Sequence, residues 1–174
     1  MDARTDMGVI FENDVILRLA GIASEGAVAA ALKGRADVVA MTGQAAAASL
    51  LPEEPGCLSH GERAALAVRV ARLHEEAGLA AHYEVLMKRA AAKGATAALA
   101  DPTFKGGGDA RLAALIAYTD RVALAPKDTV AGDIEALQAA GIADADIVRL
   151  AELVAFLAYQ LRVIAGLRLM QATT

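Results

Sequence analysis

The chain has 174 residues, 56% of them hydrophobic and 3% aromatic, a length that fits one domain and an Ala-rich composition that favours helices. The net charge of −4, with 17 Lys and Arg scattered among 21 Asp and Glu, argues against nucleic-acid binding because no basic stripe is present. The single cysteine excludes an intramolecular disulfide, and acids in the first 20 residues argue against a secretory signal, so we expect a cytoplasmic protein.

Strand signals are scarce along the whole chain. There is no alternating run of Val, Ile, Thr and Tyr, and no Asn-Gly or Asp-Gly turn. We therefore expect an all-α protein in one compact unit, with an N-terminal helical extension over residues 1–52 and a main helical domain over residues 53–174. Residues 1–13 have no clear helical pattern, and the stretch 51–56, with two prolines and a glycine, is the clearest linker.

Three helices, the first two of them short, are predicted before that linker. The first follows Asp14 and turns Val15, Ile16, Leu19 and Ile22 inward. Ser24 can cap a second helix that ends near Gly34. A third, about 35–51, stops at Pro52, since proline in a helix interior loses a hydrogen bond and clashes with the preceding turn.

A capping box predicts the start of the next helix. Ser59 and Glu62 have the spacing at which the hydroxyl and the carboxylate each satisfy a free backbone N–H. We expect this helix to bend or break near Gly78 and to resume as far as Gly94.

A glycine-rich loop separates this part from the C-terminal helices. Residues 101–108 form the loop, Asp109 opens a helix that ends before Pro126, and a short helix over 130–140 is closed by Gly141.

The last helix gives the strongest pattern. From Asp144 it places apolar residues at alternating steps of three and four on one face, and four charged residues interrupt it too often for a membrane span. Because so apolar a chain must hide its surface in a core or in subunit contacts, we expect an obligate oligomer. The face consists of Ile147, Leu150, Val154, Leu157, Leu161 and Ile164.

These closing segments resemble alkylhydroperoxidase-D-like and carboxymuconolactone-decarboxylase-like proteins. The resemblance is carried by residues 112–122, 133–142, 146–150 and 155–167, most of all by the run Phe156, Tyr159, Arg162 and Val163, and upstream by 59–83 with Arg69-Val70-Ala71. It implies an antiparallel helical bundle that assembles into dimers, trimers or hexamers.

Active members of this family carry Glu and then Cys-x-x-Cys-x-x-x-His on the helix that 59–83 resembles. A thiolate attacks the peroxide, and the second cysteine closes a disulfide. Anchoring the pattern on His82 puts Glu75 and Gly78 at the cysteine positions, and the alternative register also gives no cysteine. Peroxide reduction by a cysteine pair is therefore not expected.

Several acid–base residues remain near this position. His74 and His82 are eight residues apart, so on one continuous helix both would lie on the same face with Gly78 between them. The small glycine would leave open space beside the two histidines, as in an acid–base pocket. The alternative, which we favour, is that the acids are solvated and the histidines partly exposed. Gly78 also stands where a zinc-binding His-Glu-x-x-His motif needs its second histidine, so we predict no metal and no cofactor. The candidate residues are His74, Glu75, Glu76, His82 and Tyr83.

Cys57 is a separate candidate. It lies two residues before Ser59, where a helix N-terminus could stabilise a thiolate and allow one-cysteine peroxide chemistry. The alternative, again favoured, is a loop residue without a redox role.

Our leading hypothesis is a non-peroxidatic member of this superfamily with a structural, regulatory or small-ligand-binding role. The resemblance suggests a homo-oligomer, or a mixed assembly with a relative that keeps the cysteine pair. The first alternative is a cofactor-free decarboxylase or isomerase acting on a small organic acid through His82 or His74. A weaker alternative is peroxide reduction through Cys57.

Overall fold

The structure, a computed structural model, describes residues 14–173, and our expectation for residues 1–13 concerns a segment outside them. Among the described residues there are helices, turns and loops but no strand, which confirms the all-α prediction. The helices are α2 (Val15–Ala20), α3 (Ala27–Lys33), α4 (Ala36–Leu50), α5 (His60–Leu73), α6 (Ala77–Arg89), α7 (Gly94–Ala98), α8 (Ala110–Leu124), the 3-10 turn η1 (Pro126–Asp128), α9 (Ala131–Ala139) and α10 (Asp144–Ala172).

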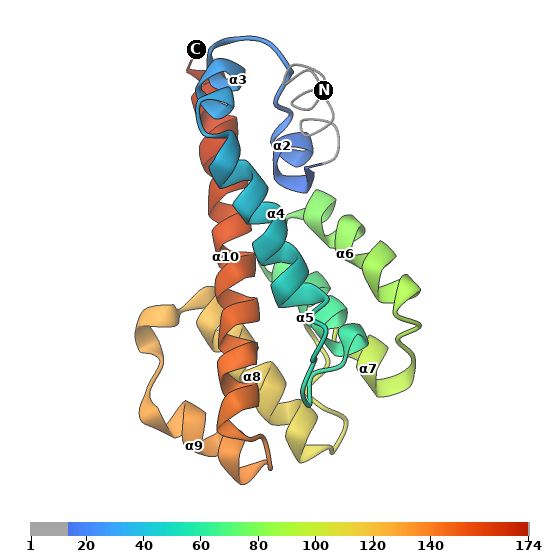
Figure 1. The fold of residues 1–174 in the computed structure, drawn as a ribbon. Helices are drawn as coiled ribbons and strands as arrows, with labels where there is room; N and C mark the ends of the chain where they lie inside the picture. The colour runs from blue at the N-terminus through green and yellow to red at the C-terminus, as the bar shows by residue number, and fades with distance from the viewer. Residues whose placement is uncertain (1–13, 174) are drawn as a thin grey trace.

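Helix α10 is the long central helix of the fold, and most of the other helices pack on it (Figure 1). It contacts α2, α3, α4, α5, α8 and α9. Its predicted apolar face is buried except at Leu161, which is partly buried. One cluster of buried side chains extends from Ile16 to Leu167, so the N-terminal helices share their core with the rest of the chain.

The composition of α10 differs from our expectation in one respect. Its charged residues are spaced widely enough to leave an 18-residue stretch with a mean hydropathy of 1.6, sufficient by length and composition to cross a bilayer. Of that stretch, 44% is buried within the fold, and core helices of soluble proteins meet the same criterion.

Helix capping follows the sequence closely. Asp14 and Asp109 accept hydrogen bonds from the first turns of α2 and α8, and Ser59 and Glu62 form the predicted capping box on α5. The prediction for Ser24 is wrong: α3 begins after Gly26 without a side-chain cap. The Ser24 carbonyl instead accepts a hydrogen bond from the Lys33 ammonium group.

Helices α5 and α6 pack against each other as a hairpin (Figure 1). The predicted bend or break near Gly78 is present as a break, but it lies a few residues earlier, and the prediction that the helix resumes as far as Gly94 is wrong. Helix α5 ends at Leu73, and Glu75, at a φ of 57°, reverses the chain before α6 begins. Helix α6 then ends at Arg89, and a separate short helix, α7, begins at Gly94.

A buried arginine of α5 organises the loop before α8. Arg69 is completely buried and donates to both carboxylate oxygens of Asp120, at 2.5 and 2.7 Å. Its guanidinium also donates to the backbone carbonyls of Asp101 and Pro102, at 2.5 and 3.1 Å. Since a buried charge is tolerated only when it is paired and hydrogen-bonded, these contacts fix the loop against α5.

A second buried arginine fixes the linker after α4. Arg63 donates to three backbone carbonyls and has no carboxylate partner among residues 14–173. Burial lowers the pKa of its guanidinium. The carbonyls belong to Ser49, Pro55 and Leu58, at 2.9, 2.9 and 3.0 Å.

Candidate functional site

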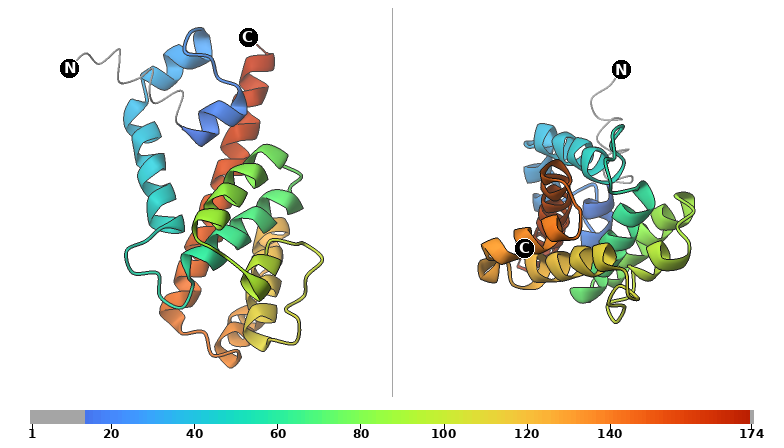
Figure 2. Two further views of the ribbon diagram at one scale, coloured as in Figure 1. Left: turned by 90° about the vertical axis from the view of Figure 1, so that its right-hand side faces the viewer. Right: turned by 90° about the horizontal axis from the view of Figure 1, so that it is seen from below.

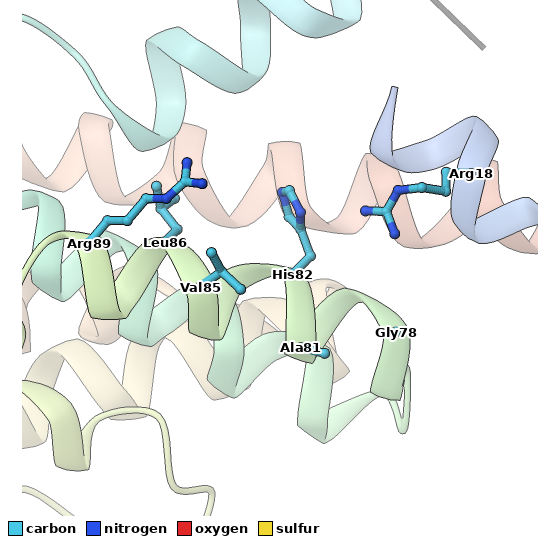
Figure 3. Close-up of a pocket in the computed structure, with 7 residues that line it drawn as sticks. All are labelled: Arg18, Gly78, Ala81, His82, Val85, Leu86 and Arg89. Atoms are coloured by element: carbon cyan, nitrogen blue, oxygen red, sulfur yellow. The ribbon is translucent and has the colours of Figure 1, made fainter. Parts of the chain in front are cut away.

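A pocket of about 350 Å³ opens between α2 and α6. Figure 3 shows Arg18 reaching in from α2, with the His82 imidazole and the Arg89 side chain rising from α6. The remaining lining residues belong to α6 and are small or apolar: Gly78, Ala81, Val85 and Leu86. The site therefore combines three nitrogen-bearing side chains with an apolar wall, a composition typical of small-molecule sites.

The pocket is cationic. Neither Arg18 nor Arg89 has an ion-pair partner among residues 14–173. Burial, followed by the positive charges of Arg18 and Arg89, holds the pKa of His82 below its usual value. At neutral pH the imidazole is consequently uncharged and stands between two guanidinium groups.

A neighbouring ion pair positions α2 against α6. Arg168 of α10 contacts the Glu76 carboxylate through two nitrogens, at 2.5 and 3.0 Å. The same guanidinium donates to the Leu19 carbonyl at 3.0 Å, next to Arg18 in the chain. Gly78 lets the helices approach closely, because a Cβ there would lie 2.8 Å from the Leu19 side chain. These contacts set the position from which Arg18 reaches the pocket.

The other predicted acid–base residues do not join His82. Because the chain reverses after Leu73, His74 and His82 lie on different sides of the hairpin, and the prediction that they share one helical stripe is wrong. Gly78 does line the pocket, but the space that a Cβ at this position would take is occupied by the Leu19 side chain. Glu75 is an exposed residue of the turn.

His74 and Glu76 line a second pocket, of about 290 Å³, together with Arg162. His74 Nε2 lies 3.1 Å from the Ala123 carbonyl of α8. The Arg168 hydrogen bonds hold the pKa of Glu76 below its ordinary value, so its carboxylate stays ionised. The Glu76 charge is paired with Arg168, so this pocket holds one arginine without an ion-pair partner among residues 14–173, Arg162, where the first pocket holds two.

Tyr83 turns away from both pockets into the core. It is completely buried, and its hydroxyl donates to the Gln160 side-chain oxygen of α10. Burial raises the pKa of the phenol well above its usual range. Tyr83 meets His82 only through an edge-on ring contact, with the centroids 5.1 Å apart. Its role is to pack α6 against α10.

Cys57 is exposed, and its surroundings on balance disfavour the thiolate. Its N–H donates to Asp146 at 3.1 Å, and its carbonyl accepts from Arg111 at 2.5 Å, so the loop is held at its backbone. Partial burial and Asp146 raise the pKa of the thiol, and Arg111, which favours the thiolate, offsets only part of this increase. The helix N-terminus near Ser59 does not produce the lowered pKa that reactive cysteines need.

Two residues of the main pocket were missed by the sequence reasoning. Arg89 follows His82 at the seventh position on the same helix, so a search for cationic residues on the His82 face would have found it. Arg18 offers no such signal, because only the packing of α2 against α6 brings it near.

Within the described part of the chain, no group of three or more His, Cys, Asp or Glu residues could hold a metal ion. Comparisons with protein-family models, curated proteins and solved structures find no match for this chain.

Proposed function

We propose that this protein binds a small organic carboxylate in the pocket between α2 and α6. The observation that carries the proposal is that the Arg18 and Arg89 guanidinium groups and the neutral His82 imidazole face one pocket, with no acid of residues 14–173 paired to either arginine. A planar guanidinium binds a carboxylate through two parallel hydrogen bonds, and an uncharged imidazole adds a donor or an acceptor.

The apolar wall restricts the class of ligand. Ala81, Val85 and Leu86 offer no hydrogen bonds, so the part of the ligand beside them should be hydrocarbon. A volume of about 350 Å³ lies at the lower end of the range for small-molecule sites. A monocarboxylate with a compact apolar body, such as a benzoate-like acid, matches both features.

Isothermal titration with benzoate tests this proposal, with benzamide as the uncharged analogue and inorganic phosphate as an anion without an apolar body. We expect saturable binding of benzoate, weaker binding of phosphate and none of benzamide. Equal binding of benzoate and benzamide, or no binding of benzoate at millimolar concentration, would remove the proposal.

We also propose that the chain is a non-peroxidatic member of the alkylhydroperoxidase-D-like superfamily, with the antiparallel bundle that its resemblance implies. The all-helical fold supports this at the level of fold class. The absence of any cysteine other than Cys57 supports the loss of cysteine-pair chemistry. Binding in the α2–α6 pocket then takes the place of peroxide reduction.

A second candidate function is proton transfer on a bound organic acid by His82. The observation that favours it is the lowered pKa of the imidazole, which leaves a free base at neutral pH beside two cations that can stabilise negative charge in a transition state. Deuterium uptake by pyruvate in D₂O, followed by NMR, tests it. We expect exchange above the buffer rate that His82→Gln abolishes, and an unchanged rate in that variant would exclude His82 as the base.

A further inference from the structure

The second pocket, of about 290 Å³, lies where the α5–α6 turn meets α8 and α10. Figure 2 shows this turn beside α10. Glu75, at a φ of 57°, reverses the chain between His74 and Glu76, and both of these residues line the pocket. Helix α10 supplies Arg162 to the same pocket. An imidazole, a carboxylate and a guanidinium therefore belong to one site.

Arg162 is the cation that this pocket offers to a ligand. It is exposed and has no ion-pair partner among residues 14–173. A guanidinium that no protein carboxylate occupies can bind a ligand carboxylate through two parallel hydrogen bonds. The α10 side of the pocket therefore favours a carboxylate.

The α5–α6 turn offers hydrogen-bond acceptors. His74 Nε2 lies 3.1 Å from the Ala123 carbonyl. Because a carbonyl oxygen only accepts, Nε2 carries the proton of the neutral imidazole, and Nδ1 is left as an acceptor. Each oxygen of the Glu76 carboxylate accepts one hydrogen bond from Arg168 and can accept a second. The turn can therefore receive hydrogen bonds from a positively charged donor.

The rest of the pocket wall is apolar and restricts the ligand. Its side chains are short or aliphatic and offer no hydrogen bonds. A volume of about 290 Å³ is just below the range of drug-sized sites, so the ligand should be compact. The wall consists of Ala123, Ala158, Leu161 and Ala165.

We propose that this second pocket binds a small α-amino acid with an aliphatic side chain. Arg162 binds the carboxylate, the ammonium group donates to His74 Nδ1 and to Glu76, and the side chain lies against the apolar wall. An α-amino acid carries a cation and an anion on neighbouring atoms, as the pocket does in complementary form. The α2–α6 pocket has two arginines and no acid among its lining residues, so it disfavours an ammonium group.

This inference does not depend on the proposed carboxylate site. The two pockets share no lining residue. Leucine binding without benzoate binding would leave this proposal standing and end the proposed function, and benzoate binding without leucine binding would do the reverse.

NMR titration of the full chain with L-leucine tests the proposal. The ring protons of His74, assigned with His74→Gln, report on this pocket, and those of His82 report on the α2–α6 pocket in the same spectra. We expect L-leucine to shift the His74 resonances saturably and to leave those of His82 unchanged. No saturable shift of His74 at millimolar L-leucine would overturn the proposal.

Two analogues of leucine test the two charged groups of the ligand separately. Isocaproate lacks the ammonium group, and isoamylamine lacks the carboxylate. Since each keeps only one of the two charged contacts, we expect both to shift His74 only at concentrations at least about tenfold higher. If either analogue shifts His74 as readily as L-leucine, the pocket does not recognise an amino acid.

Arg162→Gln tests the carboxylate contact, with Arg35→Gln as the matched control. Arg35 is also exposed and without an ion-pair partner among residues 14–173, but it precedes α4 and does not line this pocket. We expect Arg162→Gln to raise the dissociation constant for L-leucine at least about tenfold with an unchanged circular dichroism spectrum, and Arg35→Gln to leave it within about twofold. An unchanged constant in Arg162→Gln, or equal losses in both variants, would contradict the proposal.

Discussion

Arg18 of α2 and His82 of α6 face one pocket, and the charge of the first contributes to lowering the pKa of the second (Figure 3). Burial has the larger effect on the imidazole, and Arg18 and Arg89 add to it. The single negative charge of a bound carboxylate would offset part of the positive charge of the two guanidinium groups. Ligand binding and the protonation of His82 are therefore linked, and the linkage gives the site a measurable signature.

The two arginines should each contribute to carboxylate binding. Hydrogen bonds to charged groups contribute about 1.5–3 kcal/mol, so Arg18→Gln and Arg89→Gln should each weaken benzoate binding by about tenfold or more. Isothermal titration at low ionic strength measures the change. Arg162→Gln, which removes the same charge from the second pocket, serves as the control and should leave affinity within about twofold. Equal losses in all three variants would indicate a general charge effect.

Two arginines on α5 should differ sharply in their effect on stability. Arg69→Met removes a completely buried guanidinium from the partly exposed Asp120 carboxylate, which keeps only Lys105 at 4.0 Å, and from the loop carbonyls, which should cost about 3 kcal/mol of unfolding free energy. Arg72→Met removes an ion pair with Glu84 between side chains that are 40% and 35% exposed, and should cost less than about 1 kcal/mol. Urea denaturation compares them, and similar losses would contradict the assignment of Arg69 as a buried anchor.

The Cys57 thiol should be slow to react. Since its pKa is raised, less thiolate is present at pH 7 than in a free cysteine, and alkylation by iodoacetamide should be slower than that of glutathione. Purified protein should show no turnover of an organic hydroperoxide and should retain a titratable thiol afterwards. Fast alkylation together with oxidation of Cys57 would instead favour one-cysteine peroxide chemistry.

Two glycines should respond in opposite directions to replacement by alanine. Gly56 has a φ of 65°, and a Cβ there would collide with the Asp146 carboxylate, so Gly56→Ala should cost more than the roughly 1–2 kcal/mol of a left-handed alanine alone. Gly166 lies within α10 with no atom near its Cβ position, and Gly166→Ala should stabilise the protein by about 0.5–1 kcal/mol. Thermal unfolding of both variants checks the signs.

Local signals in the sequence were sufficient for much of the fold. The caps at Asp14, Ser59 and Asp109 and the stop at Pro52 depend on a few neighbouring residues, and each of the helices they bound is present. A bend or break was predicted near Gly78, but its position at Glu75 was missed, because Glu is not a residue type that favours a left-handed conformation. The residues on either side of Glu75 contact helices that are distant in the sequence: His74 contacts α8, and Glu76 contacts Arg168 of α10. Local sequence signals contain no information on such contacts.

The candidate site was predictable only in part. His82 was identified, but it was grouped with His74 by assuming one continuous helix, and the turn separates them. The seven-residue spacing of His82 and Arg89 on α6 is enough to predict that they lie on the same face. The proximity of His82 and Arg18 could not be predicted from the sequence, because it results from the packing of α2 on α6 and from the contacts of Arg168 with Leu19 of α2 and with Glu76 before α6.

The most direct test of the carboxylate site is the pKa of His82, measured by NMR titration of its ring protons with and without saturating benzoate. The chain has three histidines, so His82→Gln assigns the resonance. We predict a pKa below the ordinary value of about 6.5 in the free protein and an increase when benzoate binds, with affinity rising as the pH falls. An ordinary His82 pKa that benzoate does not change would contradict the account.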